Sequence, residues 1–323
     1  MASPNLSEIV TTTLRNRTGK LADNVTTNNA ILNRMEQKGS LQTADGGRTI
    51  VQELEYAENA SAQWYAGYQT VNISPSDVFS AAEFDWKQLS VAVTASGLEV
   101  DVQNTGEEAI IKLLASRIKN AERTMSNKLA LAMYADGTGS SGKELGGLQL
   151  LIADDPTSGT VGGINRATWS FWRNQVFDCS SDGGAAMSNA NVQGYLNTIY
   201  NRTVRQNDYC DLIMADANYY GFFENSLQMI QRITNPDMAK LGFVTLKYKG
   251  SDVVLDGGYG GNCPANHMYG LNTDFIKFRP HSRRNMVPLD TVNSINQDAM
   301  VKLIVFAGNM TLSNAFLQFT IKA

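Results

Sequence analysis

The chain has 323 residues, of which 43% are hydrophobic and 18% are charged, and its formal net charge is -4. A compact chain of this length hides about 75% of its unfolded surface, so it can build a core without disulfides or a structural metal. The negative net charge excludes a protein whose whole surface attracts nucleic acid, although local basic faces remain open.

Three widely spaced cysteines, Cys179, Cys210 and Cys263, form no CxxC pair. They predict buried or inert thiols in a reducing compartment rather than a disulfide framework or a zinc cluster. The N-terminus lacks a basic segment followed by an apolar run, and no stretch approaches the roughly 18 apolar residues of a membrane span. We therefore expect a soluble protein that is not secreted.

Charge is distributed unevenly along the chain. Residues 1–40 carry a net charge of +2, residues 41–105 carry -7, residues 106–135 carry +2, and the remainder carries -1. The first 40 residues alternate short helical patches with Thr and Asn clusters and have no sustained apolar face. A segment of that kind cannot dock firmly on a core, so we expect an extended arm.

Residues 48–103 hold two stretches with a period of two, Thr49–Leu54 and Leu89–Thr94, which predict long antiparallel strands. An aromatic group, Trp64, Tyr65 and Tyr68, lies between them. The excess of acidic residues and these aromatic side chains favour a projecting hairpin over a closed core. Aromatic residues on such a projection indicate a partner.

The strongest local signal is a helix over residues 106–135. Thr105 and Glu108 have the spacing of a capping box at its start, and Asp136-Gly137 ends it. Its charged face has two interpretations, a solvated surface or a docking face for a neighbour's acidic hairpin. Its other face is an apolar stripe that recurs every three or four residues, formed by Ile111, Leu114, Ile118, Ala121, Met125, Leu129 and Ala132.

The rest of the chain mixes helices and strands without a regular βα repeat or a fixed-period internal repeat. Lys249–Asp252 has the composition of a hairpin turn. We expect helices near residues 167–177, 189–206 and 216–234, and strands at residues 212–214, 243–248, 253–255, 275–278, 300–306 and 316–321.

Two glycine-rich segments resemble nucleotide-binding loops but lack their context. Gly137–Glu144 approaches a P-loop, yet Glu144 stands where a hydroxyl should bind magnesium, and the segment follows a helix instead of a strand. Gly257–Gly261 lacks the dinucleotide spacing and the helix that should follow it, so a flexible loop is expected.

The remaining polar clusters predict no catalytic residue, metal site or cofactor. His267 and His281 have no acidic residues at metal spacing around them, which predicts structural or surface histidines. Asp154-Asp155 precedes Pro156 in a turn composition. Arg279, Arg283 and Arg284 form a basic cluster with His281, either a solvated loop or a contact for nucleic acid or an acidic partner.

Three stretches carry a family resemblance: Gly146–Ile152 through Gly159–Arg166 with Trp169 and Trp172-Arg173, Leu212–Asp216 before a Tyr/Phe-rich helix, and Met300–Phe306 before Asn309–Asn314. With the order of arm, hairpin, long helix and mixed region, essentially the whole chain resembles the major capsid proteins of tailed double-stranded-DNA bacteriophages. These proteins have the Hong-Kong-97 fold, which herpesvirus floor domains and encapsulins share.

The resemblance implies an α+β fold in five parts. These are an N-terminal arm (1–47), an E-loop hairpin with flanking strands (48–104), a peripheral domain with the spine helix 106–135 (105–165), a mixed α/β axial domain (166–298) and C-terminal strands that return to the peripheral domain (299–323). It implies a structural protein, not an enzyme. Hexamers and pentamers of it would form an icosahedral shell around phage DNA, assembled in the bacterial cytoplasm.

The expected contacts between subunits follow from this arrangement. We expect Trp64, Tyr65 and Tyr68 to anchor the hairpin on a neighbour. The receiving spine helix would offer Arg117, Lys119 and Arg123, the arm would add Arg15 and Arg17, and Arg279, Arg283 and Arg284 are candidates for partner or DNA contact.

The resemblance also implies a separate scaffolding protein, a portal and a decoration protein, with DNA held without sequence specificity. Some family members cross-link a Lys to a neighbour's Asn, but Lys87 is the one lysine of the hairpin region and no motif fixes a partner. The alternative is an encapsulin-like compartment that encloses enzymes. A hydrolase or nucleotide-binding protein would need a polar constellation that the sequence does not present.

Overall fold

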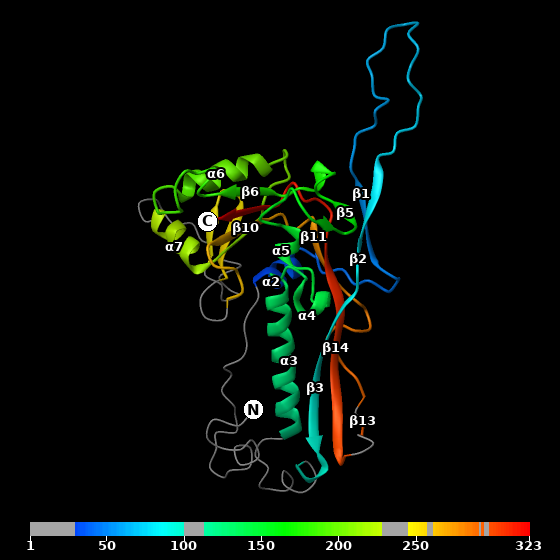
Figure 1. Ribbon diagram of the computed structural model, residues 1–323, viewed down its shortest axis with the longest axis vertical. Helices are drawn as coiled ribbons and strands as arrows, with labels where there is room; N and C mark the ends of the chain where they lie inside the picture. Colours follow the sequence, from blue (N-terminus) through cyan, green and yellow to red (C-terminus); the bar gives the residue numbers. More distant parts are fainter. Residues whose placement is uncertain (1–29, 100–112, 228–244, 257–260, 291, 294–296) are drawn as a thin grey trace.

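The computed structural model describes residues 30–99, 113–227, 245–256, 261–290, 292–293 and 297–323 (Figure 1). It is a mixed α+β protein with several sheets and few helices. A sheet covered by helices forms one part, and a long helix beside long strands forms another, while a narrow hairpin projects away from both (Figure 1).

The helices are α2 (Ala30–Gln37), α3 (Leu113–Ala132), α4 (Gly139–Gly142), α5 (Leu148–Leu151), α6 (Val192–Thr203) and α7 (Ala217–Ser226), with a 3-10 turn at Ser170–Trp172. The first strands are β1 (Ile50–Glu55), β2 (Phe79–Phe84), β3 (Lys87–Ser96), β4 (Thr160–Val161), β5 (Ile164–Asn165), β6 (Gln175–Asp178) and β7 (Leu212–Ala215). The later strands are β8 (Thr245–Tyr248), β9 (Ser251–Leu255), β10 (His267–Leu271), β11 (Ile276–Pro280), β12 (Val287–Pro288), β13 (Val292–Asn293), β14 (Ala299–Leu312) and β15 (Phe319–Lys322).

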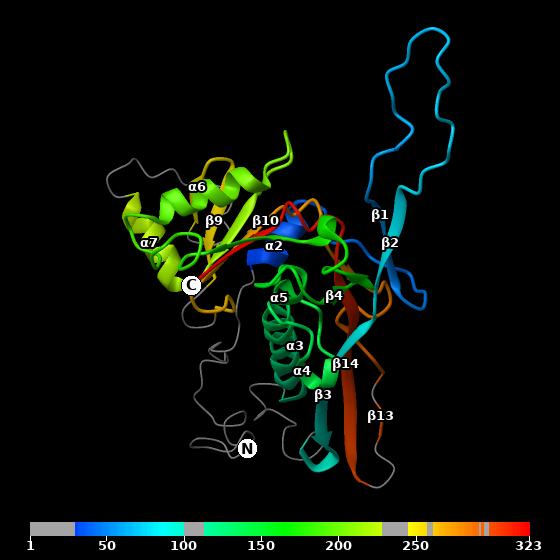
Figure 2. The ribbon, with the colours of Figure 1, turned by 45° about the horizontal axis from the view of Figure 1, so that its top comes forward.

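The largest sheet has six strands in the order β6-β15-β10-β7-β9-β8, and α6 and α7 pack against it (Figures 1 and 2). Its central strand β7 is buried on both faces. Ile213 and Ala215 point into the core under α6 and α7, whereas Leu212 and Met214 point into the opposite core. Because side chains alternate along a strand, the apolar residues of β7 contribute to the cores on both faces of the sheet.

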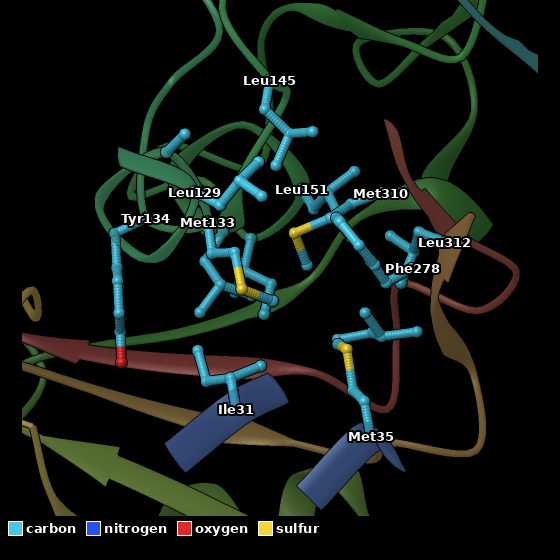
Figure 3. Close-up of a cluster of buried hydrophobic side chains, with 14 of the residues drawn as sticks. Ile31, Met35, Leu129, Met133, Tyr134, Leu145, Leu151, Phe278, Met310 and Leu312 are labelled. Atoms are coloured by element: carbon cyan, nitrogen blue, oxygen red, sulfur yellow. The ribbon is translucent and has the colours of Figure 1, made fainter. Parts of the chain in front are cut away.

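The second core joins α2, the end of α3 and the strands around β14. In Figure 3, Ile31 and Met35 of α2 lie across from Leu129 and Met133, and both α2 side chains are fully buried. The predicted apolar stripe of α3 is confirmed where it is described, since Ala121, Met125, Leu129 and Ala132 are buried and Ile118 packs against the same core. The capping box at Thr105–Glu108 lies outside the described residues.

Strand β14 is the strand around which the second sheet is built. It pairs antiparallel with β3 from Ala299 opposite Ser96 to Gly308 opposite Lys87, and its last residues pair with β11. β14 thus lies beside β3, the strand that contacts α3. The last strand, β15, instead lies between β6 and β10 in the six-stranded sheet.

Two sequence expectations need correction. The two period-two stretches do not pair with each other, because β1 pairs with β2 while β3 pairs with β14. Periodicity identifies the face that a strand buries but not its partner. The helix expected near residues 167–177 is also wrong, because this segment holds the 3-10 turn and β6, which pairs in parallel with β15.

Other expectations are confirmed in the described residues. Helices α6 and α7 lie within the expected ranges 189–206 and 216–234, of which residues 228–234 fall outside the described chain. Lys249 and Gly250 join β8 to β9 in a two-residue hairpin turn. Within the described residues, no helix combines the length and hydropathy that a bilayer crossing requires.

Candidate assembly surfaces

The projecting hairpin ends in a tip, residues 59–76, that carries no charged side chain. Strands β1 and β2 pair over only six residues each, and the chain beyond them is irregular, in contrast to the long strands expected. Trp64 and Tyr68 are fully exposed, and Ile73 is 92% exposed. The tip, which projects beyond the rest of the chain (Figures 1 and 2), thus presents large apolar side chains that its own chain does not cover.

Polar side chains at the base of the tip hold its two arms together. The hydroxyl of Ser76 donates to the Asn59 side chain at 3.1 Å and accepts from the Ala60 amide at 3.2 Å. Asn59 also accepts bonds from the amide and hydroxyl of Ser61. The aromatic residues are therefore carried on a loop that is closed at its base, with the acidic side chains of segment 41–105 all lying outside it.

On α3, the first of the three expected receiving residues is already engaged within its own chain. The Arg117 guanidinium lies 2.9 Å from a Glu99 carboxylate oxygen and donates to the Thr94 carbonyl at 2.9 Å. The hydrogen bond from Arg117 holds the pKa of Glu99 below its ordinary value. Arg117 thus fastens α3 to the end of β3.

Of the other residues predicted to contact a partner, some are exposed and some are partly buried or hydrogen-bonded within their own chain. Lys119 is exposed on α3, and Arg123 is half-buried. Arg279 donates to the Val51 carbonyl and the Gln52 side chain of β1, while Arg283 and Arg284 are exposed. Arg15 and Arg17 lie outside the described residues.

A second uncovered surface, which the sequence analysis missed, lies on the sheet formed by β3, β14, β12 and β13. Leu89, Val91 and Val93 of β3 alternate into the core that α3 shares, so the intervening residues point to the opposite face. By register, the following residues share that face, which we call the open sheet face: Ser90, Ala92 and Thr94 of β3, Val301 and Leu303 of β14, and Val287, Leu289 and Val292 beside them.

The named residues of the open sheet face are uncharged, and apart from Ser90 and Thr94 they are apolar. Val292 is 65% exposed, and Leu303, Leu289 and Val287 are each more than a third exposed. Large neighbouring apolar side chains of this kind mark an interaction surface. The sequence signal for this face is the alternation of side chains in β3 and β14. It identifies a shared face only when the pairing of the two strands is known.

Two of the polar clusters from the sequence analysis make hydrogen bonds within the chain. Asp155 accepts bonds from Thr157 and Ser158, as the predicted turn requires. His267 lies 3.0 Å from Asp154, a pairing that the sequence did not indicate across 113 positions. Across the part of the chain that the structure describes, no three His, Cys, Asp or Glu side chains are grouped closely enough to hold a metal ion.

The cysteines and the P-loop-like segment also fit their structural interpretations. Cys179 and Cys210 are buried free thiols, and burial raises the pKa of both. Residues 137–144 follow α3, and the Gly142 carbonyl accepts a bond from Lys87. Lys87 therefore lies on the body of the molecule and not on the hairpin tip. Residues 257–260 of the second glycine-rich segment lie outside the described chain.

Searches of protein-family models and of curated proteins find no match to this chain. Solved structures do match over nearly its whole length. The chain is similar to the cyanophage A-1(L) capsid asymmetric unit, with a TM-score of 0.66, 18% identity and 95% of each chain covered. The fold is that of a phage capsid protein.

Other phage capsid structures support the same fold. A chain from Mycobacterium phage Bobi matches with a TM-score of 0.59 and 11% identity, covering 97% of this chain and 96% of that one. The SrpI encapsulin of Synechococcus elongatus PCC 7942 matches with a TM-score of 0.51 and 9% identity, over 94% and 91% of the two chains. The capsid-type fold therefore extends from phage shells to a protein compartment, with the closer agreement on the phage side.

Proposed function

We propose that this chain is the major capsid protein of a tailed phage and that it assembles into hexamers and pentamers of an icosahedral shell. The observation that carries this proposal is the uncharged aromatic tip, which projects beyond the rest of the chain on a capsid-type fold (Figure 1). An exposed apolar projection is costly to keep in water unless a partner covers it. In a shell built from one chain, that partner is a neighbouring copy.

In this proposal the hairpin is the E-loop and α3 is the spine helix. The five-part division of the chain, from the arm at 1–47 to the C-terminal strands at 299–323, is part of the same proposal, with β15 assigned to the axial domain because it lies in the six-stranded sheet. Arg15 and Arg17 of the arm remain proposed contacts between subunits.

The tip of one copy is proposed to dock on the open sheet face of a neighbour. Both surfaces are uncharged and expose large apolar side chains, so neither has to desolvate an unpaired charge when they meet. The charged face of α3 suits the tip less well, because Arg117 is already paired with Glu99. Lys119 and Arg123 are then proposed as contacts at the edge of the interface.

The shell is proposed to enclose phage double-stranded DNA in the virion, after assembly in the bacterial cytoplasm. A chain with a net charge of -4 has few cations to spare for phosphate, so enclosure rather than tight binding would retain the DNA. A separate scaffolding protein, a portal and a decoration protein are proposed partners. The proposed role is structural and needs no enzymatic activity.

An encapsulin-like compartment is the second candidate, supported by the match to the SrpI encapsulin. Its lower TM-score favours the phage shell. Cargo enzymes that copurify with shells lacking DNA would favour the compartment instead.

Electron microscopy of the purified protein, with and without a candidate scaffolding partner, tests the proposal. We expect closed shells or rings of five and six subunits. Only monomers and small dimers in both samples would contradict it. Uniform shells from the pure chain would contradict the need for a separate scaffolding protein.

The Trp64→Ala variant tests the role of the tip. Because Trp64 is fully exposed, the variant should fold and melt like the wild type but assemble poorly. The matched control is Tyr209→Ala, an aromatic residue that is 42% exposed and lies away from the tip. If electron microscopy shows normal shells of the Trp64→Ala variant, the proposed docking of the tip is wrong.

A further inference from the structure

A cavity of about 610 Å³ lies where the hairpin joins the body of the molecule. The hairpin contributes Tyr56, Asp77, Phe79 and Glu83 to its lining, and the body contributes Trp169 and Phe171. The capsid fold does not by itself account for this cavity, and the sequence analysis did not single it out.

Three aromatic rings form one wall. Tyr56 stacks on Phe171 with ring centroids 5.7 Å apart and meets Trp169 edge-on at 5.7 Å. Trp169 and Phe171 lie 6.0 Å apart. Trp169 is 46% exposed and Phe79 is 76% exposed, so their faces remain accessible from the cavity side.

The charged groups of the lining are both acidic. Asp77 and Glu83 are exposed, and no Lys or Arg is among the lining residues. The Tyr56 hydroxyl donates a hydrogen bond to the Asp77 backbone carbonyl at 2.7 Å, which leaves the Asp77 carboxylate out of this contact. The Glu83 carboxylate accepts one hydrogen bond, from the Thr49 hydroxyl at 3.4 Å. Both carboxylates therefore keep oxygens available for a cation.

Aromatic faces beside carboxylates bind a planar guanidinium well. The planar guanidinium stacks on the rings, where its positive charge is attracted to the ring faces, and its N–H groups donate hydrogen bonds to the carboxylates. A phosphate or another anion is disfavoured by the two negative charges. We propose that this cavity receives an arginine side chain from a second copy of the chain.

We assign the arginine to the turn that holds Arg283 and Arg284. Both are exposed, and in the described part of the chain neither is engaged in an ion pair. The turn itself is held firmly, because the Arg284 carbonyl accepts from the Ala307 amide at 2.8 Å. Arg279 is not the donor, since it is bonded to β1 of its own chain.

This contact would set the angle at which the hairpin leaves the body. The hairpin and the body of the molecule each contribute part of the cavity wall. Within one subunit they are held together by the ring contacts of Tyr56 and by the hydrogen bond from the Glu83 amide to the Gly162 carbonyl. A neighbour's guanidinium held between them adds a bridge that only the assembled state contains. The inference rests on the proposed self-assembly and adds a second, polar contact to the apolar docking of the tip.

Charge reversal across the interface tests the assignment. Because both side chains are exposed, the variants Glu83→Arg and Arg284→Glu should fold and melt like the wild type. Each alone should lower the yield of shells about tenfold, because it brings like charges together, and the double variant should restore the yield. The control Asp45→Arg makes the same change at an exposed acidic residue outside the cavity and should assemble normally.

Single variants that assemble like the wild type, or a double variant that stays defective, would overturn the pairing of Glu83 with Arg284. A second measurement does not depend on shells. N-acetyl-arginine amide, titrated into unassembled subunits, should shift the NMR signal of the Trp169 indole N–H, and Glu83→Gln should weaken the effect. Wild-type protein that forms no shells contradicts the proposed function, whereas an unmoved Trp169 signal contradicts the cavity proposal.

Discussion

At the residue scale, buried polar groups are held by partners far away in the sequence. Tyr134, at the end of α3, donates its hydroxyl to the Asp256 carboxylate after β9. Both residues are buried, and burial raises the pKa of each. Such a pair stabilises the fold only while it is complete, because a buried polar group without its partner is costly.

Replacing Tyr134 with Phe should therefore destabilise the subunit. The buried Asp256 carboxyl group would lose the Tyr134 hydroxyl and keep the donor from the Asn262 backbone, at a cost of about 1–3 kcal/mol in the free energy of unfolding. Urea unfolding of unassembled protein measures this difference. Tyr65→Phe removes a hydroxyl from the exposed tip and should leave the midpoint unchanged. Equal midpoints for Tyr134→Phe and the wild type would show that the pair contributes nothing.

His267 and Asp154 should make stability depend on pH. The hydrogen bond to Asp154 raises the pKa of His267, and the same bond lowers the pKa of Asp154. The histidine therefore contributes fully below its unfolded value of about 6.5 and loses its contribution as pH rises through the raised folded value. The aspartate contributes above about 3.9 and loses its contribution as pH falls through the lowered value.

The pair should thus stabilise most between about pH 4 and pH 6.5. We expect the stability gap between wild type and His267→Gln to be largest there and to shrink as pH rises above 7. Urea unfolding at a series of pH values measures this gap. The other histidine, His281, is common to both proteins and cancels from the comparison. A gap that stays constant from pH 6 to 9 would exclude the pair as its cause.

At the element scale, packing between neighbouring elements decides which side chains a position accepts. α2 is an example, since Arg34 lies 3.3 Å from Asp211 and 3.6 Å from Asp252, two buried carboxylates at the start of the inner strands β7 and β9. Its apolar side, with Ile31 and Met35, enters the core. A short helix with marginal intrinsic stability is thereby fixed by charge on one side and burial on the other.

Two glycines should respond to alanine in opposite directions. A Cβ at Gly270 in β10 would lie 2.1 Å from the buried Phe319 ring, so Gly270→Ala should cost about 1–3 kcal/mol of stability. Nothing lies within 4 Å of a Cβ at Gly221 in α7, so Gly221→Ala should add about 1 kcal/mol. Thermal unfolding of both variants checks the pair. Shifts of the same sign would contradict the packing argument.

At the scale of the whole molecule, the hairpin tip and the open sheet face lie far apart, so they do not contact each other within one subunit. The tip lies at the far end of the hairpin, while the open sheet face lies beside β14 at the other end of the molecule (Figures 1 and 2). Contact between different surfaces of identical copies is heterologous, and it closes into rings when the rotation between copies allows. This separation suits a shell subunit better than a monomer.

Leu303→Lys and Lys119→Glu distinguish the two receiving surfaces. Leu303 lies on the open sheet face and is 38% exposed, so a lysine there should leave the fold intact but place a charge under the docked tip. We expect shells to be lost in Leu303→Lys and only partly reduced in Lys119→Glu, since Lys119 lies at the edge of the proposed interface, as counted by electron microscopy. The reverse result would assign the tip to the charged face of α3.

The sequence by itself determined the α+β class, the long helix with its buried stripe, the hairpin with its aromatic tip, and most of the later strands. These features are local, because periodicity and turn composition depend on residues close together in the chain. The resemblance to phage capsid proteins followed from their order, and the structural matches confirm that fold.

Only the tertiary structure decided which strands pair, that residues 175–178 form a strand, and that Arg117 and Arg279 are used within their own chain. It also brought together Asp154 with His267, the open sheet face and the cavity at the hairpin base. The physical reason is the same in each case. Such contacts join residues that are distant in sequence, and nothing in either local pattern specifies the partner.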